Sequence, residues 1–180
     1  GDGLERSDEL AFHWYREAAK QGYADAQVNV GVCYEDGVGV AQDFQEAMRF
    51  YLLAASTGDG CAEFNIGNLY LSGKGRPQSY NDAFNWFKKG AEHDDPDAQF
   101  ELAKMYESGL GVPVDLDTAL FWYQKSAGNG VVEAKEKILS TSSWKTPPKE
   151  DLFSDLSIKE LGSMADAGSA EAVFAMAGGR

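Results

Sequence analysis

Residues 26–61 read AQVNVGVCYEDGVGVAQDFQEAMRFYLLAASTGDGC, and this stretch decides the fold because its pattern recurs along the chain. The same residue types return every 36 positions over residues 1–139. The recurring positions include Ala26, Ala62, Ala98 and Ala134, then Tyr34, Tyr70 and Tyr106, and the glycines Gly37, Gly73 and Gly109. A fixed period of this length is typical of a repeat protein, in which each unit is one supersecondary motif.

Each unit is predicted to hold two helices. An apolar stripe at helical spacing, formed by Ala26, Val30 and Tyr34, predicts the first helix. Gly37 is expected to end it, because glycine tolerates the left-handed conformation found after helix C-termini. Asp43, with Glu46 three residues later, resembles a capping box and predicts the start of the second helix.

A helix pair of this kind cannot bury its apolar faces alone, so the units are expected to stack into an all-α solenoid of antiparallel helix pairs. Small residues at the middle of the first helices predict close packing of their backbone against a neighbour: Gly31, Gly67 and Ala103. The large aromatic residues at repeat positions, including the tryptophans, are expected to fill the core between units.

These residues resemble the Sel-one-like repeat family, which is related to the tetratricopeptide repeat. The matching pattern is Ala26…Val30-Gly31…Tyr34…Gly37-Val38-Gly39-Val40…Asp43-Phe44…Ala47…Tyr51…Ala54-Ala55, and the resemblance covers residues 1–139. It implies a right-handed superhelix and a role as a scaffold or adaptor rather than as an enzyme. Some exported bacterial members carry a cysteine pair in each unit. Cys33 and Cys61 do not repeat at the 36-residue step, so we expect free thiols.

The repeat phase divides the chain into units. It predicts a single solenoid domain over 1–180 with a partial unit (second helix) at 1–25, full units at 26–61, 62–97 and 98–133, a degenerate unit at 134–171 with an irregular loop at 140–155, and the start of a further unit at 172–180. Gly1 and Gly3 fall in phase with the later Gly-x-Gly turns. Because both ends are cut within units, we expect a fragment of a longer protein.

Composition and motifs argue against several function classes. The net charge is −13 and no basic cluster occurs, which disfavours nucleic-acid binding. No apolar run is long enough for membrane insertion, and no Cys/His cluster predicts a metal site. Neither His13 nor His93 has a periodic acid or nucleophile as a partner, so no catalytic residue and no cofactor is predicted. Nothing in the sequence indicates a compartment.

The face of the first helices opposite the packing stripe is the predicted partner-binding surface. It would line the concave groove of the superhelix and take a protein or peptide partner. Its three rows are Val28, Phe64 and Phe100, then Val32, Asn68 and Lys104, then Glu35, Leu71 and Glu107. Asn68 and Lys104 are the expected polar contacts. Phe64 and Phe100 are the expected anchors, although the apolar first row also suits packing between units.

Two other functions stay open at this point. The 140–155 loop contains Trp144 and Phe153, which are candidates either for docking a partner or for folding back onto the last unit. The chain is also compatible with a regulatory or accessory domain of a larger enzyme or signalling protein. In each case we expect a monomer or a component of a larger complex.

Overall fold

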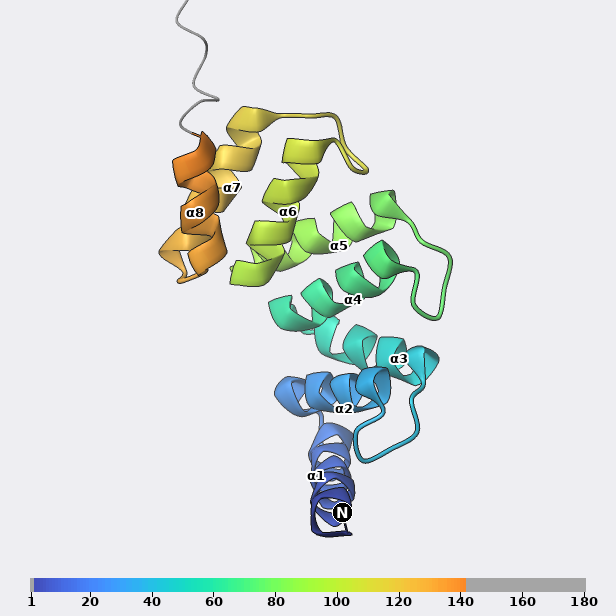
Figure 1. Cartoon of the computed structure of the whole chain (residues 1–180). Helices are drawn as coiled ribbons and strands as arrows, with labels where there is room; N and C mark the ends of the chain where they lie inside the picture. The colour runs from blue at the N-terminus through green and yellow to red at the C-terminus, as the bar shows by residue number, and fades with distance from the viewer. Residues whose placement is uncertain (1, 142–180) are drawn as a thin grey trace, which may run out of the picture. The chain divides into compact units, whose positions relative to one another are not determined.

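The computed structural model describes residues 2–141, with side chains from residue 7 onward, and this range forms eight α-helices and no strand. Figure 1 shows them following one another in chain order from α1 to α8, joined by short turns and longer loops. The helices are α1 (Asp2–Lys20), α2 (Ala24–Asp36), α3 (Phe44–Ala55), α4 (Gly60–Ser72), α5 (Tyr80–Glu92), α6 (Pro96–Ser108), α7 (Leu116–Gly128) and α8 (Val132–Ser140). The prediction of an all-α repeat solenoid is confirmed.

Local signals set the helix boundaries as predicted. The residues after α2, α4 and α6 are glycines in the left-handed conformation: Gly37 at φ 72°, Gly73 at φ 71° and Gly109 at φ 73°. The Gly37 N–H donates back to the Cys33 carbonyl oxygen, which satisfies an end group of α2. The Asp43 carboxylate accepts from the N–H groups of Gln45 and Glu46, so it caps α3.

Stacking of neighbouring helices builds the core. The pairs α2–α3, α4–α5 and α6–α7 are the helices within one unit, and α1–α2, α3–α4, α5–α6 and α7–α8 join successive units. Small side chains at the crossings are fully buried: Ala47, Ala54, Ala62, Ala83, Ala91, Ala98, Ala119 and Ala134. Alanine lets the helices approach closely, while Tyr51, Phe87 and Tyr123 fill the remaining space with no exposed surface.

The glycines inside the first helices make room for these rings. A Cβ added at Gly67 would lie 2.5 Å from a ring carbon of Phe87, and one added at Gly31 would collide with the Tyr51 ring. The prediction of close packing is therefore correct at these two glycines, and the neighbour is an aromatic side chain from the second helix of the same unit.

The second glycine of each Gly-x-Gly pair makes a contact between units. Gly39 and Gly111 have φ values of 68° and 72°. A Cβ on Gly111 would collide with the main-chain carbonyl of Tyr80, the first residue of α5, and a Cβ on Gly39 would collide with that of Asp8 within α1. A Cβ added at Gly75 would collide with the Cβ of Phe44, the first residue of α3. The turn of each of these units thus packs directly against the second helix of the preceding unit.

Three expectations need correction or lie outside the described range. The helix α1 begins at Asp2, so Gly3 is helical and not part of a turn. The repeat tryptophans are not fully buried, since Trp86 and Trp122 are half-buried and Trp14 is 63% exposed. The 172–180 segment, and the parts of the 134–171 unit and of the 140–155 loop beyond residue 141, lie outside the described residues.

Candidate functional site

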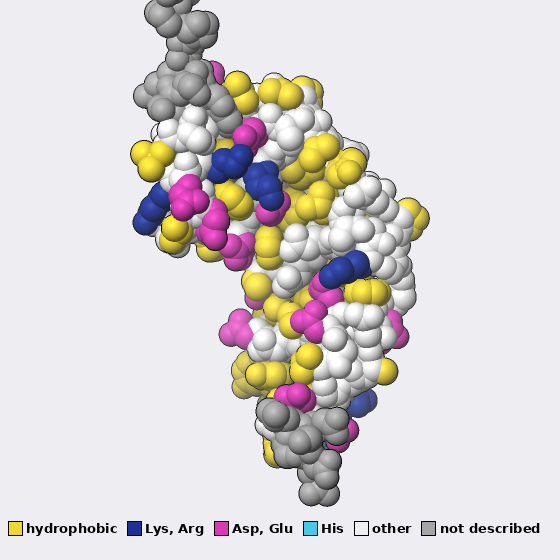
Figure 2. Space-filling view, viewed as in Figure 1, with side chains coloured by type: hydrophobic (Ala, Val, Ile, Leu, Met, Phe, Trp, Pro, Cys, Tyr) yellow, Lys and Arg dark blue, Asp and Glu magenta, His cyan; other side chains and the backbone are white. Residues whose placement is uncertain are grey.

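A cavity of about 490 Å³ opens on the first-helix side of the solenoid, between α4, α6 and α8. Its lining mixes apolar residues with both signs of charge: Leu71, Glu101, Lys104, Met105, Glu107, Ser108, Leu110 and Lys137. Figure 2 shows lysine and acidic side chains gathered beside apolar ones over α6 and α8. This volume lies within the range of about 300–1,000 Å³ that is usual for ligand pockets.

The structure brings together three of the nine predicted groove residues in this cavity: Leu71, Lys104 and Glu107. Of the others, Val28 is buried, Val32 is 38% exposed, and Glu35, Phe64, Asn68 and Phe100 are half-buried outside it. Sequence reasoning missed the other five lining residues: Glu101, Met105, Ser108, Leu110 and Lys137. Lys137 belongs to the next unit, and a periodicity along the chain does not show which neighbouring side chain reaches across.

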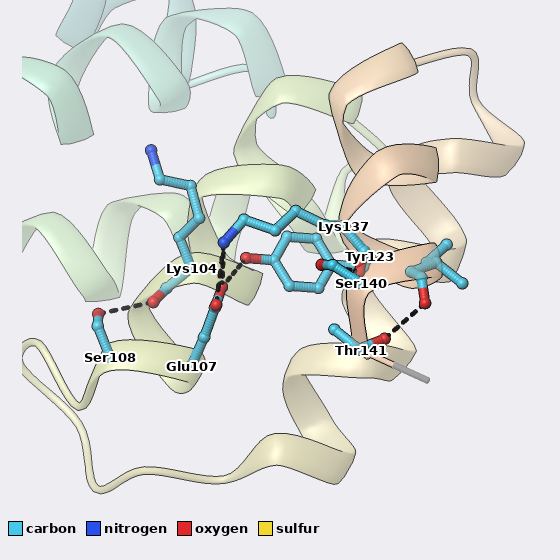
Figure 3. A network of polar contacts seen from close by, with 8 residues as sticks. Lys104, Glu107, Ser108, Tyr123, Lys137, Ser140 and Thr141 are labelled. Atoms are coloured by element: carbon cyan, nitrogen blue, oxygen red, sulfur yellow. Dashed lines mark hydrogen bonds and ion pairs between the residues drawn. The ribbon is translucent and has the colours of Figure 1, made fainter. Parts of the chain in front are cut away.

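Glu107 is the centre of the polar network at this site. Its carboxylate accepts a hydrogen bond from the Tyr123 hydroxyl (Figure 3). It also forms an ion pair with Lys137, whose Nζ lies 2.9 Å from Glu107 Oε1. Burial, and then the adjacent Glu107 carboxylate, raise the pKa of Tyr123, so its hydroxyl stays protonated and remains a donor. The network therefore ties α6, α7 and α8 together at the wall of the cavity.

The first unit repeats this arrangement, and the middle unit replaces it. Glu35 accepts from the Tyr51 hydroxyl at 3.0 Å and from Lys74 at 3.1 Å. In the middle unit the glutamate becomes Leu71 and the tyrosine becomes Phe87. The polar Glu–Tyr pair is thus exchanged as a whole for an apolar Leu–Phe pair, and Leu71 adds apolar surface to the lining of the cavity.

The two predicted anchors are held by their own units. The ring of Phe64 lies 5.9 Å from that of Phe87, and the ring of Phe100 lies 5.6 Å from that of Tyr123. Lys104 pairs with Glu101 at 2.7 Å, and its Nζ lies 5.5 Å from the centroid of Phe100. Packing within the unit accounts for the phenylalanines, so Leu71 is the better candidate for an apolar partner contact.

The described residues show no cluster for metal binding. No group of three or more His, Cys, Asp or Glu residues in this range could hold a metal ion. The sequence shows no periodic acid as a partner for either histidine, but the structure gives His93 a partner that is not periodic, since Gln27 and Gln99 stand where Glu63 does. The His93 Nδ1 lies 2.6 Å from the buried Glu63 carboxylate, and this hydrogen bond raises the pKa of His93. Cys33 and Cys61 are free, as predicted.

Comparisons with known proteins agree with this fold, in which 36-residue helix pairs have glycines after their first helices and small residues where the helices cross. The Sel1 repeat family model matches residues 1–23, 24–59, 62–95 and 96–131. The chain belongs to the Sel1 repeat family. Sel1 repeat proteins are generally protein-interaction scaffolds and are typically not catalytic. A search of curated proteins gives no match. No helix between residues 2 and 141 is long and apolar enough to cross a membrane.

Solved structures of Sel1 repeat proteins are similar to this one. A Sel1 repeat protein from Oxalobacter formigenes is 35% identical with a TM-score of 0.65, covering 74% of this chain and 55% of that one. A protective antigen of uropathogenic Escherichia coli strains with an SLR fold is 27% identical with a TM-score of 0.72, covering 94% and 36%. Cysteine rich protein B of Helicobacter pylori is 18% identical with a TM-score of 0.61, covering 76% and 99%, which shows the fold alone. The present chain therefore spans about half or less of the first two proteins.

Proposed function

We propose that this Sel1 repeat protein is a scaffold whose first-helix groove binds a segment of a protein partner at the cavity between α4, α6 and α8. The observation that supports this most is the convergence of Leu71, Lys104 and Glu107 on one cavity. These residues come from two different units, so the site exists only in the stacked solenoid.

The chemistry of the cavity suits a peptide with an apolar side chain and polar neighbours. Leu71 and Leu110 offer apolar surface, and Leu110 is 39% exposed. Lys104 and Lys137 offer donors, but each is paired with a glutamate, so the cavity carries no strong net charge. Selectivity would therefore come from the positions of these groups rather than from long-range attraction.

The test is a comparison of two charge-reversed variants. The immobilised chain captures proteins from a lysate of its source organism, and calorimetric titration then measures the affinity of each purified candidate. We expect Lys104→Glu to weaken binding about tenfold or more, because it places a second carboxylate beside Glu101. Lys88→Glu is the matched control, since Lys88 is exposed on α5 and does not line the cavity.

Circular dichroism and thermal unfolding should show that both variants keep their helices, because the ion pair of each lysine lies within one helix and both lysine side chains are about half exposed. A partner that binds Lys104→Glu as tightly as the unaltered chain would place the binding site elsewhere. Equal weakening by Lys88→Glu would indicate a general charge effect and would also reject the groove.

A further inference from the structure

A second cavity, of about 420 Å³, lies at the other end of the solenoid and shares no residue with the groove site. The end of α1, the beginning of α2 and the middle of α3 form it. Its lining residues are Arg16, Ala19, Lys20, Gly22, Gln27, Arg49, Phe50 and Leu53. Three cationic side chains and no carboxylate line this cavity, although the protein carries a net charge of −13.

The three cations are not equally neutralised. Lys20 pairs with Glu17 on α1, and Arg49 pairs with Glu46 on α3 at 2.8 Å. Among the described residues, Arg16 forms no ion pair within 4.0 Å. The cavity is therefore expected to attract a negatively charged group. The planar guanidinium of Arg16 supplies the hydrogen-bond donors, because no ion pair within the described residues occupies them.

Gln27 gives the cavity an unmet hydrogen-bond acceptor. Its side chain is 8% exposed, and its Nε2 donates to the Ala19 carbonyl oxygen at 3.4 Å. Its Oε1 is buried and has no hydrogen-bond partner. A buried polar atom without a partner is uncommon in folded proteins and costs stability. The position is therefore one where a donor from outside the chain would be favoured.

The repeat itself shows which kind of donor belongs there. Gln99, two periods later, donates in the same way to Ala91, and its Oε1 accepts from the Asn129 side-chain amide at 3.0 Å. The residue that corresponds to Asn129 in the first unit is Thr57. Its hydroxyl donates to the Ala54 carbonyl oxygen instead and leaves Gln27 without an N–H donor.

An apolar wall completes the cavity. Phe50 is buried, and Leu53 is 43% exposed beside it. Neighbouring Leu52 is also 44% exposed. The other second helices within residues 2–141 carry polar or charged pairs at the positions of these two leucines: Arg16-Glu17, Lys88-Lys89 and Gln124-Lys125. An exposed leucine pair on one of the four described second helices is the kind of apolar surface that marks a contact site.

We propose that this cavity binds a short acidic segment of a partner polypeptide. A carboxylate of the segment lies near Arg16, a main-chain N–H donates to Gln27 Oε1, and an apolar side chain packs on Phe50 and Leu53. Phosphate or a simple carboxylate offers no N–H donor, whereas a peptide supplies donor, charge and apolar group together. Because Oε1 is covered, binding includes a rotation about the last torsion of Gln27, which is soft for a side-chain amide. The proposal does not depend on the groove site.

The probe is acetyl-Asp-Leu-Asp-amide, added to the isotope-labelled full chain and followed by ¹H–¹⁵N NMR. We expect shifts of the Gln27 side-chain amide and of the Arg16 Nε–H, with affinity that falls as salt is added. Arg16→Glu should weaken binding about tenfold, and acetyl-Lys-Leu-Lys-amide should not bind. Lys104→Glu is the matched control and should leave the affinity for this peptide unchanged, since Lys104 belongs to the other cavity.

Thr57→Asn is the decisive variant. It should supply the missing donor from within the chain, as Asn129 does for Gln99, so the melting temperature should rise while peptide affinity falls about fivefold. The proposal is overturned by an absence of peptide shifts at Gln27, by equal binding of the lysine peptide, or by unchanged affinity in Thr57→Asn.

Discussion

The exchange of a Glu–Tyr pair for a Leu–Phe pair in the middle unit leads to a double-mutant prediction. Phe87 is fully buried, and its position corresponds to Tyr51, whose hydroxyl donates to Glu35 at 3.0 Å. Phe87→Tyr would bury a hydroxyl that faces Leu71 instead of a carboxylate. Leu71→Glu would in turn place a carboxylate against a ring that has no donor. Together, the two substitutions would rebuild the polar pair of the flanking units.

The magnitudes follow from the cost of unmet polar groups. Phe87→Tyr alone should lower the free energy of unfolding by about 1–3 kcal/mol, because its hydroxyl lacks a partner. Leu71→Glu alone should lower it by about 1 kcal/mol or more, through loss of half-buried apolar surface and partial desolvation of the new charge. A hydroxyl-to-carboxylate hydrogen bond restores part of both losses. We therefore expect a favourable coupling energy of about 1–2 kcal/mol.

Urea unfolding of the four chains, followed by circular dichroism, measures this coupling. Tyr51→Phe in the first unit is the matched control and should cost about 1 kcal/mol, since it removes the equivalent bond and leaves Glu35 with only Lys74. A coupling energy below about 0.3 kcal/mol, which is the error of additivity for independent sites, would refute the idea that positions 71 and 87 are exchanged as a pair.

Three further outcomes follow from other contacts. Gly67→Leu should lower the free energy of unfolding by about 1–3 kcal/mol in urea titration, because any Cβ there meets the Phe87 ring; an unchanged midpoint would contradict that packing. Because the pKa of His93 is raised by Glu63, the pair should add stability below about pH 6.5, the usual histidine value, and lose it as pH rises through the folded pKa. His93→Gln should remove this difference between pH 5.5 and 8.5, and a profile that keeps it would exclude the pair as its source. Desolvation and nearby aspartates raise the pKa of Cys61 to about 11, so iodoacetamide at pH 7 should modify it about a hundredfold more slowly than a thiol with a pKa of 9; rates equal to those of a model thiol, followed by mass spectrometry, would argue against it.

The helices and their ends could be predicted because the signals are local. Gly37 and Asp43 act through their own backbone conformation and their own side-chain bonds, and neither depends on distant residues. The solenoid followed from the period, since stacked units repeat the same burial at every step. Even the exchange of Glu–Tyr for Leu–Phe is visible in the sequence once the 36-residue step is known.

The candidate site was predicted less completely because it depends on contacts between units. Val28 was predicted to lie on the groove face, but it is buried. The angle between neighbouring helices decides which residues at the edge of a helix face become covered, and the sequence does not show this angle. Lys137 was missed for the same reason, because its reach to Glu107 crosses from one unit to another. Trp14 shows the opposite error, since it follows the repeat yet is 63% exposed.

The glycine contacts between units separate the geometry of the solenoid from its surface chemistry. At Gly39 and Gly111 the contact between successive units is made by main-chain atoms, because the glycine has no side chain and its nearest neighbour is a carbonyl group. Substitutions along the first helices can therefore change what the groove recognises without changing the pitch of the repeat. A designer could exchange the residue at position 104 for new specificities while these glycines stay, whereas position 71 would have to change together with position 87, and position 107 together with position 123.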